Sequence, residues 1–282
     1  MVRIVADSTC DLSGSIANDY GISIVPLHIV LGEKEYRDGV DIHPEDIFAW
    51  CEENKTTPKT SAVSYEDVID TLTPIAQSGD EAIVFVISES MSTTGNIFRM
   101  AINELEAEDR IFVFDSKNLS VGIGLMALEA CDMAKAGANA KEILCKLESL
   151  RGRVRASFVV DSLTYLARGG RCSAATALAG GVLKIHPKIV VKDGVMEADK
   201  RYRGQMRSVV MDYVNDMRDE MLNAEMNRVF LVYAGTEKEI IEEVYAYLKG
   251  LEHFGDILEL NAGGVISSHC GPGTLGVMFV SK

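Results

Sequence analysis

Aromatic residues and cysteines are scarce in this chain of 282 residues, which has one Trp, nine Tyr, nine Phe and six Cys. The cysteines include no C-x-x-C pair, so zinc-ribbon and thioredoxin-type motifs are excluded. The five histidines show no zinc-ligand spacing among themselves or with cysteine. We therefore expect no metal site. We also expect all six cysteines to be reduced and to serve as small hydrophobic residues. They are Cys10, Cys51, Cys131, Cys145, Cys172 and Cys270, and Cys131 and Cys145 lie within predicted helices.

Long apolar runs are also missing. No stretch approaches the ~18 apolar residues that a membrane-spanning helix needs. Near the N-terminus, Asp7 interrupts the region where a secretory signal would require about 7–15 apolar residues. We expect a cytoplasmic protein and leave a transient membrane contact open.

Several catalytic motifs are absent as well. The sequence has no G-x-S-x-G and no G-x-x-x-x-G-K-[ST], and the pair Gly122 and Gly124 does not extend to G-x-G-x-x-G. Asp7 ends a predicted strand, as an aspartyl nucleophile would, but Thr9 occupies the place of the second acid in a D-x-D arrangement. We predict a protein without its own catalysis and without a cofactor. The alternative is a phosphotransferase or esterase that acts on a small acidic substrate through Asp7 or Ser92.

The charge of the chain is acidic overall but basic in one segment. Asp and Glu number 42 against 28 Lys and Arg, a formal net charge of −14, and this charge disfavours nucleic-acid binding. Residues 151–207 contain 12 Lys and Arg against 4 Asp and Glu. This segment predicts a solvated basic face or a patch for an acidic partner or a phosphate group. A module that only docks a partner through residues 151–207 is a third interpretation.

Apolar runs alternate with helical patterns in the first half of the chain. The predicted strands lie at residues 2–6, 22–31, 82–88 and 110–116. The predicted helices lie at 12–20, 64–77, 95–106 and 121–150, with one more beginning at Pro44. This alternation is typical of an α/β fold with a parallel sheet.

The second half has a different pattern, typical of an α+β fold. Strands are predicted at 157–160 and 228–233, with a hairpin turn at Asp193-Gly194. Helices are predicted at 174–183, 204–223 and 237–249, the last capped by Thr236 and Glu239. We therefore predict an N-terminal α/β domain over residues 1–155 and a C-terminal α+β domain over 156–282.

Polar side chains collect after the predicted strands. Asp-Ser pairs close three of them, at residues 7–8, 115–116 and 161–162, and Ser88 closes a fourth. Ligands of open α/β sheets bind beyond these carboxyl ends, although such pairs also cap helices. Two hydroxyl-rich segments, in the polar loop 56–61 and at 88–95, can hold a small anion without formal charge. His269 lies among glycines and is either a ligand or a hydrogen-bonded structural residue.

Eight motifs follow one another along the chain. They are Asp7-Ser-Thr-Cys-Asp-Leu12, Pro26-Leu27, Tyr36-Arg-Asp38, Pro58-Lys-Thr-Ser61, Ser88-x-x-Met-Ser-Thr-Thr94, Asp115-Ser116, Asp161-Ser-Leu-x-Tyr-Leu-x-Arg-Gly-Gly-Arg171 and His269-x-Gly-Pro-Gly273. In this order they resemble the DegV family of bacterial fatty-acid-binding proteins over nearly the whole chain. The resemblance implies two α/β domains that enclose a long-chain fatty acid in an apolar tunnel.

The resemblance also implies a partner and a set of site residues. The protein would be the carrier subunit of a two-component fatty acid kinase that supplies phospholipid synthesis, and a separate kinase subunit would form the acyl phosphate. Thr60, Ser92 and His269 would bind the fatty-acid carboxylate, with Ser61 beside them. Arg171, Arg203 and Arg207 would face the kinase subunit or the phosphate.

The chain departs from the family pattern in two places. Residues 92–95 are Ser-Thr-Thr-Gly where the family commonly has Ser-Gly-Thr-Tyr, and residues 62–64 are Ala-Val-Ser in place of Gln-Pro-Ser. Because Thr93 adopts a positive φ less readily than glycine, we expect altered backbone geometry beside the carboxylate.

Overall fold

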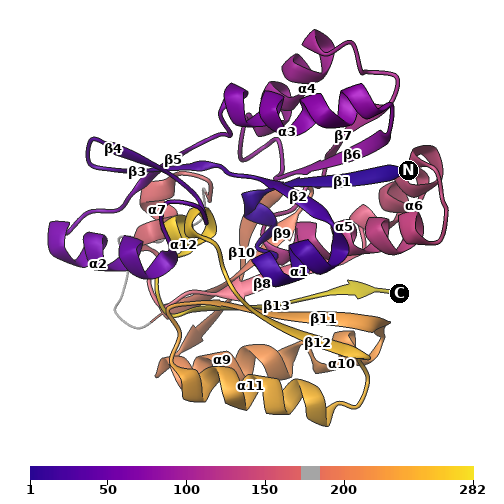
Figure 1. Ribbon diagram of the computed structural model, residues 1–282. Helices are drawn as coiled ribbons and strands as arrows, with labels where there is room; N and C mark the ends of the chain where they lie inside the picture. The colour runs from indigo at the N-terminus through magenta and orange to yellow at the C-terminus, as the bar shows by residue number, and fades with distance from the viewer. Residues whose placement is uncertain (173–184) are drawn as a thin grey trace.

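Four parallel strands form the sheet of the N-terminal half in the computed structural model, which describes residues 1–172 and 185–282 (Figure 1). Their order is β2 (Ile22–Val25), β1 (Val2–Asp7), β6 (Glu81–Val86) and β7 (Ile111–Asp115). Successive side chains of a strand point to opposite faces. Val84 and Val86 thus pack with α3 (Tyr65–Ser78) and α4 (Thr94–Glu104), whereas Ile83 and Phe85 pack with α5 (Val121–Lys135). The predicted parallel α/β architecture is confirmed.

Six strands form the larger sheet of the C-terminal half. Their order is β10 (Val195–Arg203), β9 (Ile185–Lys192), β8 (Val154–Val159), β13 (Thr274–Ser281), β11 (Ala224–Ala234) and β12 (Asp256–Asn261). Only β11 and β12 pair in parallel, so this sheet is mixed. One face is covered by α9 (Met206–Asp216), α10 (Arg218–Leu222) and α11 (Lys238–Gly250), as Figure 1 shows. The predicted α+β character is confirmed.

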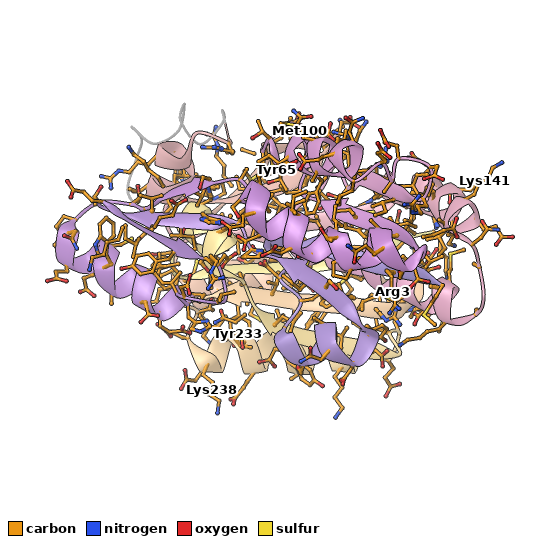
Figure 2. All side chains as sticks on the ribbon, turned by 45° about the horizontal axis from the view of Figure 1, so that its top comes forward. Arg3, Tyr65, Met100, Lys141, Tyr233 and Lys238 are labelled. Carbon is orange, nitrogen blue, oxygen red and sulfur yellow. The ribbon has the colours of Figure 1, made fainter. Side chains whose placement is uncertain are left out.

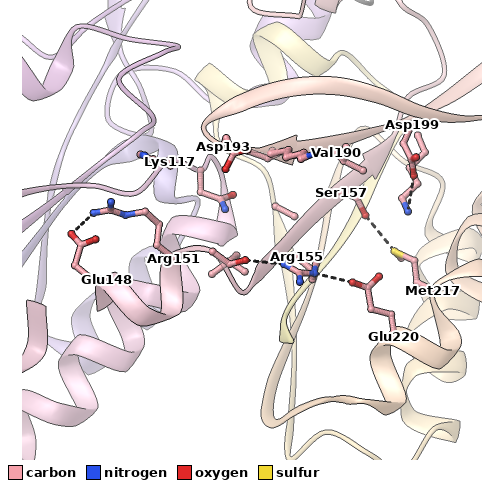
Figure 3. Close-up of a pocket in the computed structure, with 17 residues that line it drawn as sticks. Lys117, Glu148, Arg151, Arg155, Ser157, Val190, Asp193, Asp199, Met217 and Glu220 are labelled. Atoms are coloured by element: carbon pink, nitrogen blue, oxygen red, sulfur yellow. Dashed lines mark hydrogen bonds and ion pairs between the residues drawn. The ribbon is translucent and has the colours of Figure 1, made fainter. Parts of the chain in front are cut away.

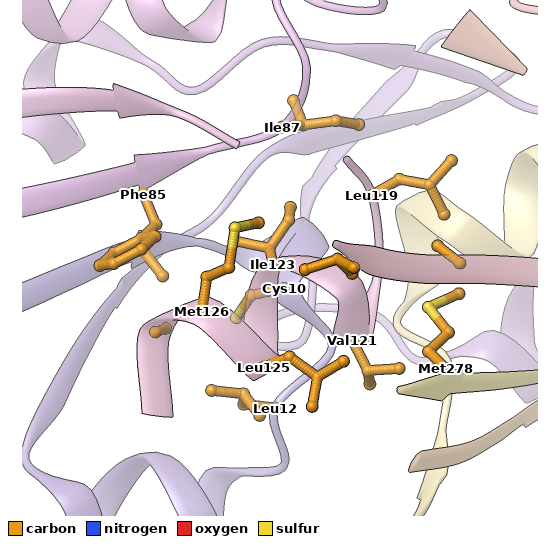
Figure 4. Packing of buried hydrophobic residues seen from close by; sticks show 14 of the residues in the cluster. Cys10, Leu12, Phe85, Ile87, Leu119, Val121, Ile123, Leu125, Met126 and Met278 are labelled. Carbon is orange, nitrogen blue, oxygen red and sulfur yellow. The ribbon is translucent and has the colours of Figure 1, made fainter. Parts of the chain in front are cut away.

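Helix α5 lies between the two sheets. Most of its residues are apolar, and ten of them are buried. Figure 4 shows the helix with Phe85 of β6 on one side and Met278 of β13 on the other. The largest hydrophobic cluster therefore belongs to both halves. The domain boundary near residue 155 remains a prediction, because this shared core crosses it.

A small third sheet projects beside the first and supports the candidate site. It is built from β4 (Lys34–Arg37), β3 (His28–Leu31) and β5 (Lys59–Ser61), with α2 (Pro44–Asn54) next in space. Pro26 lies between β2 and β3, so the run at 22–31 forms two strands. The loop prediction for 56–61 is wrong at its end, because residues 59–61 pair with β3.

Other differences concern helix ends. The pattern at 121–150 forms α5 and α6 (Ala140–Arg151), separated by a turn at Gly137 with φ of 93°. The pattern at 204–223 divides into α9 and α10. Helix α1 covers Gly14–Tyr20, after a short 3-10 turn over Ser8–Cys10. Thr236 does not cap α11, because its hydroxyl donates to the Thr274 carbonyl instead. The helix predicted at 174–183 lies outside the described residues.

The surface carries most of the charged side chains, as Figure 2 illustrates with Arg3, Lys141 and Lys238. None of the six cysteines forms a disulfide, and all except Cys145 are buried. Cys145 lies in α6, within the predicted helical pattern, but it is exposed to solvent. In the described ranges, no helix is both long and apolar enough to cross a bilayer.

Candidate functional site

A cavity of about 470 Å³ opens where three segments of the chain meet. The segments are β5, the loop that follows β6, and α12 (Gly264–Cys270), which lies beside α7 (Thr164–Gly169). We call this space the hydroxyl cavity. Its polar lining comes from Thr60, Ser61, Glu89, Ser90, Ser92, Thr93, Arg171 and His269. The apolar lining comes from Leu27, Ala62, Ile87, Met91, Leu119, Met196, Val265, Ile266 and Cys270.

Thr60 and His269 are in direct contact across this cavity. The Thr60 Oγ1 atom lies 2.8 Å from His269 Nε2, although the residues are 209 positions apart in the chain. Pairing of Thr60 with Ile29 fixes β5, and the last turn of α12 carries the imidazole. A hydroxyl and an imidazole that share a hydrogen bond can together donate to an anion in the cavity.

The imidazole of His269 is electrically neutral at physiological pH. Burial lowers the pKa of His269 to about 4, and the positive charge of Arg171 acts in the same direction. The His269 Nδ1 atom is buried and has no hydrogen-bond partner among the described atoms. A Cβ atom on Gly169 would lie only 2.3 Å from this nitrogen, so the ring position requires glycine in α7.

Ser92 is oriented by the first turn of α4. Its Oγ lies 3.0 Å from Thr94 Oγ1 and accepts a 3.3 Å hydrogen bond from the Thr94 N–H. The amino end of α4, where the helix dipole favours negative charge, therefore lies next to the Ser92 hydroxyl. Thr93 has φ of −89°. This φ is negative, as a threonine prefers, and the expected difference from the family's backbone at this position stays a prediction.

Ser61 and Arg171 lie at the rim of the cavity. Ser61 is exposed and donates a 3.4 Å hydrogen bond to Glu35. Arg171 donates from its guanidinium to the Gly169 carbonyl at 2.7 Å and, more weakly, to the Met91 carbonyl at 3.5 Å. No carboxylate of the described residues forms an ion pair with Arg171. Its positive charge therefore stays available to an anion in the cavity.

The other two arginines of the predicted site do not line the cavity. Arg203 ends β10, and Arg207 lies on α9, where its Nε contacts Glu243 of α11 at 2.7 Å. Both side chains are exposed. The cavity thus brings together Thr60, Ser61, Ser92, His269 and Arg171, while a partner-facing role of Arg203 and Arg207 remains a prediction.

The geometry of Asp7 and Ser92 gives no support to a catalytic nucleophile. Asp7 is fully buried, outside the cavity, and accepts hydrogen bonds from the backbone of Thr9 at 3.0 Å and of Ile87 at 2.8 Å. Burial raises the pKa of Asp7 to about 6. Ser92 has no basic side chain as a hydrogen-bond partner among the described residues. Asp7 joins the end of β1 to the start of the loop that carries Ser92.

The sequence patterns did not predict which apolar residues line the hydroxyl cavity, nor the contact between Gly169 and His269. Met196 reaches the cavity from β10, and Leu119 from the loop before α5. No motif marks them, because their role arises from packing between distant segments. Gly169 is part of the Gly-Gly-Arg motif, but its contact with His269 depends on the neighbouring positions of α7 and α12.

Three comparisons relate the chain to known proteins. It matches the family described as "Uncharacterised protein, DegV family" over residues 1–282. A DegV domain-containing protein of Caldanaerobacter subterraneus is 32% identical, and the match covers 100% of this chain and 99% of that protein. The solved structure of a Thermus thermophilus DegV family protein, described by its fatty acid binding, has 31% identity and a TM-score of 0.89, with coverage of 100% and 99%. A stearic-acid-binding protein from Eubacterium ventriosum has 29% identity and a TM-score of 0.85, with coverage of 100% and 99%.

Proposed function

Because the chain belongs to the DegV family, we propose that it binds a long-chain fatty acid in the hydroxyl cavity, with the carboxylate at Thr60, Ser61, Ser92 and His269. The observation that carries this proposal is the 2.8 Å contact between Thr60 and His269 at an apolar-walled cavity. Fatty acid binding by similar DegV proteins supports it. The protein is a carrier in this proposal, and the chemistry takes place on a separate subunit.

The acyl tail supplies most of the affinity. A saturated chain of about 16 carbons has roughly 14 methylenes, and their burial at ~0.8 kcal/mol each contributes on the order of 11 kcal/mol before ordering costs. The tail begins against Leu119 and Ile266, which also line a small apolar hollow with Phe158 and Met278. The aliphatic wall therefore runs from the carboxylate site toward the space between the sheets.

Neutral donors hold the head group. A buried carboxylate without partners would cost several kcal/mol or take up a proton, so hydrogen-bond donors are needed. Because a proton on the buried Nδ1 would have no acceptor, we assign the proton of neutral His269 to Nε2, which then donates to Thr60 Oγ1 and leaves the Thr60 hydroxyl proton for the ligand. Ser92 supplies a second hydroxyl. Arg171, at the rim, balances part of the negative charge.

This head-group site suits a carboxylate that is later phosphorylated. A bidentate arginine clamp would hold both oxygens and reduce their nucleophilicity. Here two of the five N–H groups of Arg171 donate to backbone carbonyls, so this arginine contributes positive charge at the rim, and the other donors of the site are uncharged. We propose that the protein presents the bound carboxylate to an ATP-using kinase subunit, and that Arg171, Arg203 and Arg207 face that subunit or the phosphate.

Native mass spectrometry of the purified chain tests the fatty-acid proposal. We expect an added mass of one fatty acid, lost under denaturing conditions and regained when delipidated protein is mixed with palmitate. Hexadecan-1-ol, which has the chain length of palmitate but no carboxylate, serves as the control and should bind much more weakly. A protein that neither carries nor takes up fatty acid would refute the proposal.

A further inference from the structure

A second hollow, of about 640 Å³, lies at the junction of the two halves of the chain (Figure 3). The N-terminal half contributes Lys117 after β7 and the end of α6. The C-terminal half contributes residues of β8 and β9. We call it the junction cavity. Sites at the meeting of two structural units are a common location for small ligands.

The lining of the junction cavity is cationic in a chain that is strongly acidic. Five basic side chains line it, and they are Lys117, Arg151, Arg155, Lys188 and Lys192. The four acidic ones are Glu148, Asp193, Asp199 and Glu220. The cavity thus has an excess of one positive charge, whereas the whole chain has a net charge of −14. This local reversal of sign favours an anionic ligand.

The charges of the cavity are not all compensated by the protein. Arg151 pairs with Glu148 at 2.6 Å, Arg155 with Glu220 at 2.9 Å, and Lys188 with Asp199 at 3.3 Å. Within the described ranges, Lys117 and Lys192 have no ion-pair partner, and neither has the one remaining acid, Asp193, so two positive charges face one negative charge. Lys117 belongs to the N-terminal half and Lys192 to the C-terminal half, and both line the same hollow.

Arg151 adds a fixed cation to this pair of lysines. Its guanidinium lies over the Phe114 ring, 4.5 Å from the ring centre, and the Glu148 contact holds its other end. The Arg151 Nε atom is buried and has no hydrogen-bond partner among the described atoms. This buried Nε is out of reach of a ligand, so an oxyanion in the cavity would accept from the outer N–H groups of the guanidinium that Glu148 does not take.

We infer that the junction cavity binds a dianionic phosphate group, free or as a monoester, between Lys117, Lys192 and Arg151. A phosphate has more acceptor oxygens than a carboxylate and can satisfy ammonium groups on two walls at once. The aliphatic side chains of Val154, Val190 and Met217 give the organic part of a monoester an apolar surface. The site is separate from the hydroxyl cavity, with which it shares no lining residue.

Calorimetric titration of the full chain with inorganic phosphate and, separately, with adenosine 5′-monophosphate tests this inference. We expect saturable binding of at least one of them, weakened roughly tenfold for each cation removed in Lys117→Ala, Lys192→Ala and the double variant. Tighter binding of the nucleotide assigns the site to a monoester, and equal or tighter binding of inorganic phosphate assigns it to the free ion.

A control variant with the same loss of one positive charge distinguishes binding in the junction cavity from attraction by the overall charge of the protein. Lys141→Ala removes an exposed charge on α6 outside the cavity and should leave phosphate binding unchanged. The inference is overturned if neither ligand binds saturably, or if Lys141→Ala weakens binding as much as Lys117→Ala. Fatty acid retention, measured on the same preparations, should be unaffected by all of these variants, so a failure here is distinct from a failure of the proposed function.

Discussion

The Asp38 carboxylate accepts a 2.7 Å hydrogen bond from the backbone N–H of Gly264. Gly264 is the first residue of α12, the helix whose last turn carries His269. Asp11 accepts a 2.9 Å bond from the preceding Gly263 N–H, and Ser8 donates to Asp38 at 2.8 Å. The N-terminal half therefore holds the start of α12 and, through this short helix, the position of the His269 imidazole.

Asp38→Asn should weaken both folding and ligand binding. The substituted side chain would keep one acceptor oxygen, but its NH2 group would replace the second oxygen, so either the Ser8 hydroxyl or the Gly264 N–H would lose its acceptor. A buried donor without an acceptor lowers the free energy of unfolding by about 1–3 kcal/mol. We expect fatty acid retention to fall as well, because α12 shifts. Urea unfolding and mass spectrometry measure the two effects. Asp19→Asn, an exposed change on α1 at a carboxylate without a hydrogen bond or ion pair among the described residues, should alter neither, and equal behaviour of both variants would contradict this account.

Thr60→Val should reduce fatty acid affinity without unfolding the protein. The valine retains the shape of the side chain but removes the hydroxyl, which costs about 1.5–3 kcal/mol for a hydrogen bond to a charged group, or roughly tenfold or more in dissociation constant. Competition with a fluorescent fatty acid measures the change. Thr73→Val alters a threonine on α3 that does not line the cavity and should bind normally. Unchanged affinity of Thr60→Val would remove this hydroxyl from the site.

The stability contribution of His269 should depend on pH. Its pKa is about 4 in the folded protein and 6.5 in the reference state, so the unfolded chain binds the proton more readily. Stability is therefore lost as the pH falls from about 6.5 toward 4, by up to about 3 kcal/mol. Asp7, with its pKa raised to about 6, acts in the opposite direction over a similar range.

His269→Gln isolates that contribution. Asp7 is present in both proteins, so its effect cancels in the difference between their unfolding free energies. We expect this difference to shrink as the pH is lowered from 7 to 4, measured by urea unfolding at several pH values. A difference that is independent of pH would show that His269 is not held neutral by burial.

Gly169→Ala should displace the His269 ring. The added Cβ would lie 2.3 Å from Nδ1, closer than real contacts allow, so the imidazole or α7 must move. We expect a loss of fatty acid retention larger than the loss of thermal stability. Gly250→Ala, where a Cβ meets nothing within 4 Å, is the matched control and should retain the ligand. Normal retention in Gly169→Ala would mean that the ring position is not critical.

The sequence predicted the layered α/β and α+β halves because burial patterns along single segments reveal them. The spacing of residues did not predict that Thr60 and His269 meet, because they are 209 positions apart in the chain. Only the resemblance to a family placed them in one site. Residues 59–61 were expected in a loop, because three polar residues form a strand only when β3 is beside them. The resemblance grouped Arg203 and Arg207 with Arg171 as partner-facing or phosphate-facing residues, and of the three only Arg171 lines the cavity, because β10 and α9 carry the other two elsewhere.

Helix α5 also limits how a ligand can enter. A hinge motion that separated the two sheets would break the packing between α5 and β13, where Val121 and Met278 lie, and would expose the largest hydrophobic cluster to water. Rigid opening of the halves is therefore the costly route. Because such a separation would expose this apolar surface to water, we expect a ligand to enter without separation of the two sheets.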